Sequence, residues 1–282
     1  MKKISVLGAG VMGAGIAQEA ARAGYTVVLR DLQNSLVKDG LKSIKCGLER
    51  WEEQQLLSSN DKDEILGRIT GTTDLTVAGD VDLVIEAVVE NMAVKRQLFA
   101  ELDNICPQHT VLMTNTSSLS ISEIASSTHR QAKVMGMHFF YPVPSTRLVE
   151  LVRGMATSDN TLQLAKEFCT KIGKQTVVVK RESPGFIVNR IMVPYLNEAI
   201  HVLGDGLASR EEIDLAMKLG LGMTNGPLEI ADSIGLDYLY SVILTFYNEF
   251  RDPKYRPHTL FSTMIKAGYL GKKSGHGFYD YV

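Results

Sequence analysis

The feature that most constrains this sequence is a glycine-rich turn close to its beginning. Gly8, Gly10 and Gly13 follow a short β-rich run in the spacing G-x-G-x-x-G, and small residues typical of a helix come next. Gly8 permits a tight strand-to-helix turn, Gly10 lets a pyrophosphate approach the backbone, and Gly13 lets helix and strand pack closely. Backbone N–H groups around Val11 and Met12 would face the phosphates. The pattern predicts a dinucleotide-binding βαβ unit.

An acidic residue further along supports this prediction. Asp31 ends the second predicted strand, at residues 25–30, and lies 18 residues past Gly13. A carboxylate there accepts hydrogen bonds from ribose hydroxyls and repels a 2′-phosphate, which favours NAD over NADP. The neighbouring Arg30 weakens that preference, because arginine is the usual partner of a 2′-phosphate. Taken alone, Asp31 is better explained as a turn residue after a strand.

Composition and charge exclude several classes of function. The net charge of −2 gives no electrostatic footprint for nucleic acid or an anionic membrane. No run approaches the ~20 apolar residues of a membrane span, and the apolar start lacks a signal-peptide cleavage site. The three cysteines are widely spaced and form no C-x-x-C pair, and the six histidines show no metal-ligand spacing. We therefore expect an ordinary cytoplasmic protein without a metal, membrane or nucleic-acid partner.

The first half of the chain alternates β-rich runs with helical stretches, which predicts an α/β fold with a doubly wound, mostly parallel Rossmann sheet. From about Ser183 the segments become helical. We expect an NAD-binding domain over residues 1–182 and a smaller all-helical domain for substrate and dimerisation over 183–282, with Ser183 capping and Pro184 opening a helix over 186–203. Residues 58–63 and 268–277 look flexible. The expected strands are 4–7, 25–30, 82–88, 110–114, 133–138 and 175–180, and the expected helices are 34–57, 92–105, 185–204, 209–219, 236–251 and 258–268.

Polar side chains follow two of the predicted strands. Asn115 and Ser117 come directly after the strand at 110–114, and His138 ends the strand at 133–138, with Glu150 twelve residues beyond it. Oxidation of an alcohol by NAD needs a base for the hydroxyl proton, and imidazole suits this task because its pKa of ~6.5 lies near working pH. A carboxylate on the far ring nitrogen would fix the tautomer. At this point a core histidine is the better explanation of His138, and a solvated strand residue is the better explanation of Glu150.

The sequence resembles the 3-hydroxyacyl-CoA dehydrogenase family over its whole length, and in particular its short stand-alone bacterial 3-hydroxybutyryl-CoA dehydrogenases. Many motifs occur in the family's order. They are Gly8-Ala9-Gly10-Val11-Met12-Gly13, Asp82-Leu83-Val84-Ile85-Glu86-Ala87, Asn115-Thr116-Ser117-Ser118, His138-Phe139-Phe140, Leu148-Val149-Glu150, Ser183-Pro184-Gly185-Phe186 with Asn189-Arg190, Gly226-Pro227-Leu228-Glu229, Ile234-Gly235-Leu236-Asp237 and Gly275-His276-Gly277-Phe278-Tyr279-Asp280.

The resemblance implies roles for particular residues. His138 matches the family's general base, and Glu150 matches the acid that pairs with it. Ser117 matches a serine that hydrogen-bonds the reacting oxygen, and Asn189 matches an asparagine that holds the substrate. The implied reaction converts an (S)-3-hydroxyacyl-CoA to the 3-oxoacyl-CoA, or the reverse. Implied cofactor contacts are Glu90, Lys95 and Asn115, for which a surface ion pair (Glu90 and Lys95) and a turn residue (Asn115) remain alternatives.

This sequence departs from the family pattern in three places. Tyr141 follows His138-Phe139-Phe140 where the family usually has asparagine, and residues 222–226 differ from the family's N-H-P-M-G. The helix after Asp31, which is lysine-rich in the family and contacts coenzyme A, carries Arg50 as the cation best placed for a CoA phosphate. Glu52 and Glu53 beside it would repel one, and a plain solvated helix face remains an alternative.

These departures keep two further hypotheses open. One is a dehydrogenase of the same fold that acts on a free hydroxy acid, such as a sugar acid. The other is a non-catalytic NAD-binding descendant, against which the presence of Ser117, His138, Glu150 and Asn189 argues. The resemblance also implies a homodimer through the helical domain. Its apolar residues Ile200, Leu203, Leu239, Ile243, Leu244 and Phe250 suit either a dimer face or that domain's own core.

Overall fold

The computed structural model describes residues 1–281, and these form two compact units, Met1–Ser183 and the described residues from Pro184 onward. The boundary expected from the sequence, between residues 182 and 183, lies one residue before this division.

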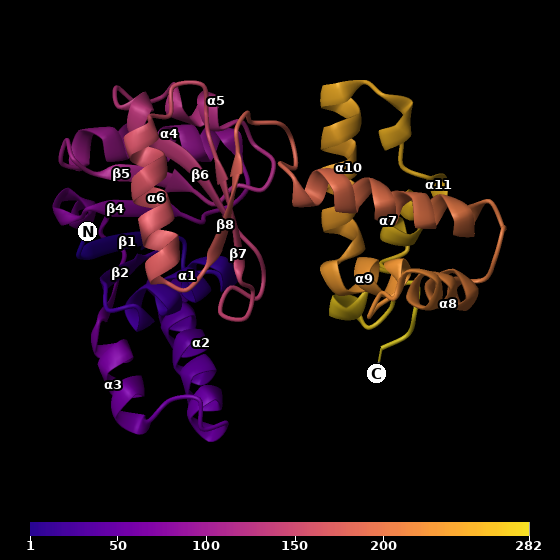
Figure 1. Ribbon diagram of the computed structural model, residues 1–282, viewed down its shortest axis with the longest axis horizontal. Helices are drawn as coiled ribbons and strands as arrows, with labels where there is room; N and C mark the ends of the chain where they lie inside the picture. Colours follow the sequence, from indigo (N-terminus) through magenta and orange to yellow (C-terminus); the bar gives the residue numbers. More distant parts are fainter. Residues whose placement is uncertain (282) are drawn as a thin grey trace. The chain divides into compact units, whose positions relative to one another are not determined.

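The first unit is built on one eight-stranded sheet with the strand order β3-β2-β1-β4-β5-β6-β7-β8 (Figure 1). All neighbouring strands run parallel except β6 and β7, which are antiparallel. The predicted fold class, a mostly parallel doubly wound sheet followed by a helical domain, is confirmed. The strands are β1 (Lys3–Leu7), β2 (Thr26–Arg30), β3 (Ile69–Thr72), β4 (Leu83–Glu86), β5 (Val111–Thr114), β6 (Val134–Phe139), β7 (Leu148–Val152) and β8 (Gln175–Val179).

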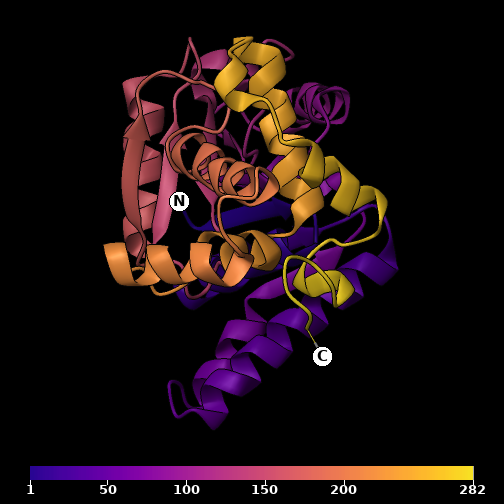
Figure 2. The same ribbon diagram turned by 90° about the vertical axis from the view of Figure 1, so that its right-hand side faces the viewer.

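The helices of this unit connect and cover the strands. Helices α2 and α3 form a hairpin that extends away from the sheet in both views (Figure 1, Figure 2). Central strands are buried on both faces, as the apolar runs predicted, and every residue of β4, β5 and β6 is buried. The helices are α1 (Val11–Arg22), α2 (Asn34–Glu53), α3 (Ser59–Gly67), α4 (Met92–Ile105), α5 (Ile121–Ala125) and α6 (Asp159–Lys171).

Several elements of the first unit escaped prediction from the sequence. Strand β3 has the weakly apolar sequence Ile-Thr-Gly-Thr, and β7 has no alternating pattern, so neither carries a clear period-two signal. The expected flexibility of residues 58–63 is wrong. Ser58 and Asp61 form a reciprocal capping box that begins α3, and such a box stabilises the exposed N–H groups of a helix start. The short helix α5 and the helix α6 were also missed.

The second unit is helical. Its long helix α7 begins at Val188 rather than at Phe186, so Ser183 does not cap it and Pro184 does not lie in its first turn. The reason lies in the backbone, because Gly185 and Phe186 both have positive φ angles, +77° and +50°, which a right-handed helix cannot include. The helices are α7 (Val188–Gly204), α8 (Arg210–Leu221), α9 (Pro227–Ile234), α10 (Leu236–Phe250) and α11 (Thr259–Lys266).

The core of the second unit changes two expectations. Ile200, Leu239 and Ile243, which we considered for a dimer face, are at most 1% exposed within the unit's own core and offer no outer surface. The glycine-rich tail is also held in place rather than loose. The buried carboxylate of Asp232 accepts hydrogen bonds from the backbone N–H groups of Phe278 and Tyr279, both at 2.9 Å.

Within residues 1–281, no helix combines the length and apolar character that crossing a bilayer requires. The same residues contain no group of three or more His, Cys, Asp or Glu side chains arranged to hold a metal ion. The cysteines are free thiols. Burial raises the pKa of Cys106 to about 11 and that of Cys169 to about 12, which keeps both protonated and unreactive at neutral pH.

Candidate active site

The glycine turn lies where the strand order of the sheet reverses, between β1 and β4, and ligands of such sheets bind at this point. Gly8 has φ +100°, and a Cβ on it would lie 2.4 Å from the carbonyl oxygen of Ala87 at the end of β4. A Cβ on Gly13 would lie 1.8 Å from the oxygen of Gly8. A Cβ on Gly10 would meet nothing within 4 Å. Two glycines therefore bring helix and strands together, and the third leaves open space beside the backbone.

The start of α1 faces that space with unoccupied donors. Gly10 is the N-cap residue and has no side chain to cap the helix, and the first helical bond is donated by the N–H of Ala14 to the oxygen of Gly10 at 2.9 Å. The N–H groups of Val11, Met12 and Gly13 therefore have no acceptor within the helix. Together with the positive end of the helix dipole, they form a site that fits the pyrophosphate of NAD.

Asp31 is tied to the same turn. Its Oδ2 accepts a hydrogen bond from the N–H of Ala9 at 2.7 Å, and its Oδ1 accepts one from the N–H of Leu32 at 2.6 Å. An ionised carboxylate offers about four acceptor positions, so two remain for ribose hydroxyls. Asp31 thus has the geometry for the predicted role, and it also fixes the turn itself.

A buried ion pair lies at the carboxyl end of β4. The Nζ of Lys95, which is 1% exposed, lies 2.6 Å from Oε1 of Glu86, which is 0% exposed. Glu86 also accepts hydrogen bonds from the N–H of Val88 and the hydroxyl of Thr114, both at 2.7 Å. The alternative of a surface ion pair between Glu90 and Lys95 is wrong in its location only, because the two groups do pair at 3.4 Å but the ammonium group of Lys95 is buried. Sequence reasoning missed Glu86, although an acid at the end of an otherwise apolar strand was its signal.

Glu90 extends this network toward the surface. Its Oε2 lies 3.4 Å from Nζ of Lys95, and its Oε1 accepts hydrogen bonds from the hydroxyl of Thr116 at 2.5 Å and the N–H of Ser117 at 3.0 Å. The predicted residues Glu90, Lys95 and Ser117 are thus brought together by β4, α4 and the segment after β5. Thr116, which links them, was not singled out from the sequence.

Asn115 connects two neighbouring strands. Its side-chain oxygen accepts a hydrogen bond from the N–H of Phe139 at 2.8 Å, which joins the end of β5 to the end of β6 beside His138. Its backbone N–H in turn donates to the oxygen of Glu86 at 2.7 Å. Asn115 is therefore more than a turn residue, because it sets the spacing of the strand ends that carry the site.

His138 and Glu150 form a buried pair across the antiparallel strands β6 and β7. The two residues lie directly opposite each other in the register, and Nδ1 of His138 lies 2.8 Å from Oε2 of Glu150. Both side chains are buried, and the ring of Phe140 packs against that of His138 with the centroids 4.4 Å apart. The alternative of a solvated Glu150 is therefore wrong. The contact orients the imidazole, whose Nε2 lies on the side away from Glu150.

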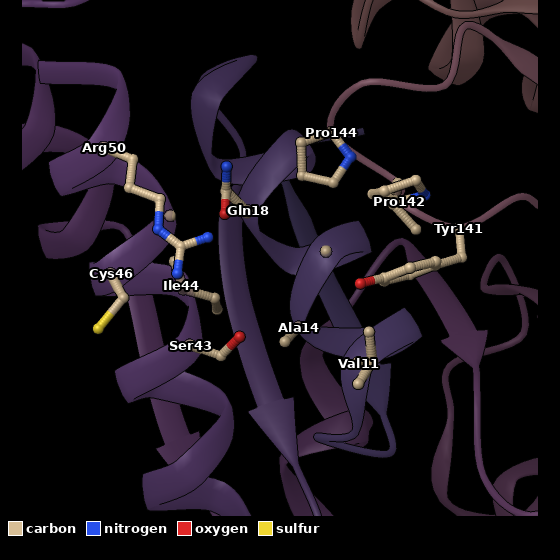
Figure 3. Close-up of a pocket in the computed structure, with 13 residues that line it drawn as sticks. Val11, Ala14, Gln18, Ser43, Ile44, Cys46, Arg50, Tyr141, Pro142 and Pro144 are labelled. Carbon is tan, nitrogen blue, oxygen red and sulfur yellow. The ribbon is translucent and has the colours of Figure 1, made fainter. Parts of the chain in front are cut away.

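A cavity of about 240 Å³ lies along α1 in the first unit (Figure 3). Arg50 on α2 directs its guanidinium group into the cavity from one side, and Tyr141, which is 70% exposed, points its hydroxyl into it from the other. The residues that line it include the small residues Ala14 and Gly15 of α1. Arg50 is exposed to solvent and lines this pocket, whose opposite wall begins three residues after His138, so a solvated helix face stays an alternative for it.

Asn189 belongs to the second unit, where it lies in the first turn of α7. It is buried, with 4% exposure, and among the described residues its Nδ2 has no hydrogen-bond partner. A buried amide donor without a partner is costly, and a bound oxygen would satisfy it.

The turn, the buried His–Glu pair and the helical second unit together define an NAD-linked dehydrogenase. The chain belongs to the 3-hydroxyacyl-CoA dehydrogenase family, because the family's NAD-binding domain matches residues 3–183 and its C-terminal domain matches residues 185–281.

Similar proteins cover the whole chain. A probable 3-hydroxybutyryl-CoA dehydrogenase of Bacillus subtilis is 46% identical over 100% of this chain and 98% of its own length. A 3-hydroxybutyryl-CoA dehydrogenase of Clostridioides difficile is 45% identical over 99% of both chains. The crystal structure of an (S)-3-hydroxybutyryl-CoA dehydrogenase from Ralstonia eutropha matches with a TM-score of 0.97 and 44% identity, over 100% of this chain and 99% of that one.

Removing the ammonium group of the buried pair should destabilise the first unit. We expect Lys95→Met to lower the free energy of unfolding by about 3–5 kcal/mol, because it leaves the carboxylate of Glu86 buried without its cation. Urea unfolding measures the loss, and the matched control is Lys45→Met, which breaks an exposed 3.9 Å pair with Glu49 and should lose about 0–1 kcal/mol. The double variant Glu86→Gln, Lys95→Met should lose less than Lys95→Met alone. Equal losses for Lys95→Met and Lys45→Met would contradict the assignment.

Proposed function

We propose that the protein interconverts (S)-3-hydroxybutyryl-CoA and acetoacetyl-CoA with NAD. The observation that carries the proposal is the buried contact of 2.8 Å between His138 and Glu150, on strands of the same sheet as the NAD-binding turn. The names of the relatives support the same substrate, since those from Bacillus subtilis and Clostridioides difficile are both described as 3-hydroxybutyryl-CoA dehydrogenases.

Bound at the glycine turn, NAD would supply the acceptor for the hydride that leaves C3 of the hydroxyacyl group. His138 takes the hydroxyl proton on Nε2, so that the C3–O bond becomes a carbonyl as the C3–H bond breaks, and it returns the proton in the reverse direction. Glu150 stabilises the imidazolium ion that forms and holds the ring in one tautomer. Burial of both groups strengthens this electrostatic effect, because little water screens their charges.

We further propose that Ser117 and Asn189 bind the substrate. The hydroxyl of Ser117, which follows β5, donates to Oε1 of Glu90 at 3.4 Å and would turn from this long contact to a substrate oxygen. Asn189 offers the buried Nδ2 that lacks a partner among the described residues, which suits a carbonyl or hydroxyl oxygen of the substrate. Such donors accelerate the reaction where they meet the oxygen on which negative charge develops.

The cavity beside α1 is proposed to hold the coenzyme A part of the substrate, with Arg50 as the partner of a phosphate group. Arginine suits phosphate because its planar guanidinium group donates two parallel hydrogen bonds. The repulsion expected from Glu52 is reduced, since Glu52 is paired with Lys62 and receives the hydroxyl of Ser59. The hydrogen bond from Lys62 is the main reason that the pKa of Glu52 is lowered, so its charge is held and compensated there. Glu53 is exposed to solvent.

The homodimer implied by the resemblance is also a proposal. With Ile200, Leu239 and Ile243 inside the core, the exposed leucines of α8, Leu215 and Leu219, are the better candidates for an apolar contact because they lie four residues apart on one helix face. Sedimentation velocity should give about twice the chain mass of 31.1 kDa. A single species at the chain mass at micromolar concentration would contradict a dimer.

Replacement of the proposed base should remove the activity and leave cofactor binding intact. With acetoacetyl-CoA and NADH, we expect His138→Asn to lower kcat about 10²–10⁴-fold, which is the usual contribution of a positioned acid or base. The rate at which NADH absorbance decreases gives kcat. A fluorescence titration should show an unchanged Kd for NADH. Glu150→Gln should lower kcat less, because the imidazole remains. Full activity of His138→Asn would refute the assigned base.

The same assay with the wild-type protein distinguishes the proposed function from the two alternatives, a hydroxy-acid dehydrogenase and a non-catalytic NAD-binding protein. Turnover of free 3-hydroxy acids well above that of their CoA thioesters would favour a hydroxy-acid dehydrogenase. Tight NADH binding without any hydride transfer would favour a non-catalytic NAD-binding protein.

The charge of Arg50 should matter only for substrates that carry the CoA phosphates. We expect Arg50→Met to raise KM for acetoacetyl-CoA about tenfold, the equivalent of one charge-assisted hydrogen bond, and to leave KM for the acetoacetyl thioester of N-acetylcysteamine unchanged. Lys45→Met on the same helix is the matched control, because Lys45 does not line the cavity. An equal effect of both substitutions would place the phosphates elsewhere.

A further inference from the structure

Lys174 is a buried cation that the reaction does not use. It precedes β8, its side chain is 4% exposed, and its Nζ donates hydrogen bonds to the carbonyl oxygens of Val143 at 2.6 Å and Thr146 at 2.8 Å. The oxygen of Pro144 is 3.5 Å away. The carboxylate of Glu19 on α1, which is fully buried, lies 3.5 Å from the same Nζ. One ammonium group therefore donates hydrogen bonds to two carbonyl oxygens of a single loop.

That loop, residues 140–147, joins β6 to β7 and so connects His138 to Glu150 along the chain. It is held from a second side by α1, where a Cβ on Gly15 would lie only 2.8 Å from Cβ of Val143. The backbone N–H of Gln175, next to Lys174, donates to the oxygen of Arg147 at 2.7 Å and fastens the end of the loop. The loop is thus anchored by contacts from α1 and from the start of β8.

The outer side of this loop forms one wall of the cavity beside α1. Tyr141, Pro142, Val143 and Pro144 all line the cavity, and Arg50 enters from the other side (Figure 3). Tyr141 lies three residues after His138 along the chain, which places it within ~11 Å of the proposed base by chain length. A substrate that runs from His138 to Arg50 therefore passes Tyr141 with the part between its reacting carbon and its phosphates.

We propose that Lys174 is a positioning residue for acyl-CoA, which holds the 140–147 loop so that Tyr141 contacts the pantetheine arm of the substrate. Tyr141 is then the residue that distinguishes a CoA thioester from a truncated one, and Lys174 acts only through it and its loop. This inference rests on the proposed function. This role accounts for the exposed aromatic ring of Tyr141. The face of the ring would pack against the pantetheine arm, and its hydroxyl would form a hydrogen bond with an amide group of that arm.

A cation suits this position for a physical reason. Backbone carbonyls of a tight loop need donors when they are turned inward, and an ammonium group carries three. Burial lowers the pKa of Lys174, and the nearby carboxylate of Glu19 opposes that effect. Arg22 completes the group, with its Nη2 2.8 Å from Glu19.

The molecule contains a matched control for a merely structural role. Arg130 is also a buried cation that grips one turn, through hydrogen bonds to the carbonyl oxygens of Asp103, Cys106 and Pro107 at 2.6–2.9 Å and to the carboxylate of Asp103 at 2.6 Å. This turn precedes β5, and Arg130 precedes β6, so the cluster lies at the amino ends of the strands. The 140–147 loop lies at the opposite edge, after the carboxyl end of β6.

The experiment compares Lys174→Met, Arg130→Met and Tyr141→Ala in the full chain. Calorimetry measures binding of CoA alone, and steady-state kinetics with NADH measures KM for acetoacetyl-CoA, acetoacetyl-pantetheine and the acetoacetyl thioester of N-acetylcysteamine. We expect Lys174→Met and Tyr141→Ala each to raise KM for the first two substrates about fivefold to tenfold, with KM for the third and Kd for NADH unchanged. Arg130→Met should change none of these.

The double variant tests whether Lys174 acts through Tyr141. Lys174→Met added to Tyr141→Ala should change KM for acetoacetyl-CoA less than twofold further, because the two residues then share one effect. Fully multiplicative effects, or equal KM changes in Lys174→Met and Arg130→Met, would overturn the proposal. If Lys174→Met does not fold, Tyr141→Ala decides, because its exposed side chain can be removed without harm to the core; an unchanged KM would then overturn it.

The assay with the wild-type protein tests the proposed function separately from the role of Lys174 and Tyr141. Absence of wild-type turnover with every thioester and NADH would contradict the function. Normal wild-type turnover with no effect of either substitution would contradict only the role of Lys174 and Tyr141.

Discussion

The parallel pairing of β1, β4, β5 and β6 is the constraint on which the rest of the site depends. Parallel strands end at the same edge of a sheet, so whatever follows each strand gathers there. The glycine turn follows β1, Glu86 ends β4, Asn115 follows β5 and His138 lies at the end of β6. Strand β7, which runs antiparallel to β6, then returns from this edge and brings Glu150 directly opposite His138. The glycine turn and the pair of His138 and Glu150 therefore lie at the same edge of the sheet.

Buried charges hold this edge in place. The ion pair of Lys95 and Glu86 lies at the end of β4. Lys174, which pairs with Glu19, donates hydrogen bonds to the loop that follows β6. Pairs of this kind contribute little net stability compared with apolar packing, but removal of one partner is strongly destabilising. They also impose geometry, since a buried ammonium group must meet its acceptors at fixed distances. In this protein they lie at the strand ends around the proposed site.

Sequence reasoning succeeded where a function requires a local pattern. The spacing of Gly8, Gly10 and Gly13 depends on contacts within one turn, and the structure places each glycine where its lack of a Cβ matters or leaves room. Strand β7 was missed because its apolar residues do not alternate, so it has no local signal. Helix α3 was missed although it has such a signal, because we interpreted its capping residues as a flexible loop. The start of α7 was misplaced because the positive φ angles of Gly185 and Phe186 are set by their surroundings.

The sequence by itself determined the class of fold, the NAD-binding turn and the family, because each depends on residue types at short, fixed spacings. Tertiary structure alone decided which side chains meet. It turned Glu150 from an ambiguous acid into the partner of His138, buried Lys95 against Glu86, and removed Ile200, Leu239 and Ile243 from any outer face. It also placed Arg50 and Tyr141 on opposite walls of one cavity. Such contacts join residues far apart in the chain, and their distances follow from strand register and helix packing, which no local pattern encodes.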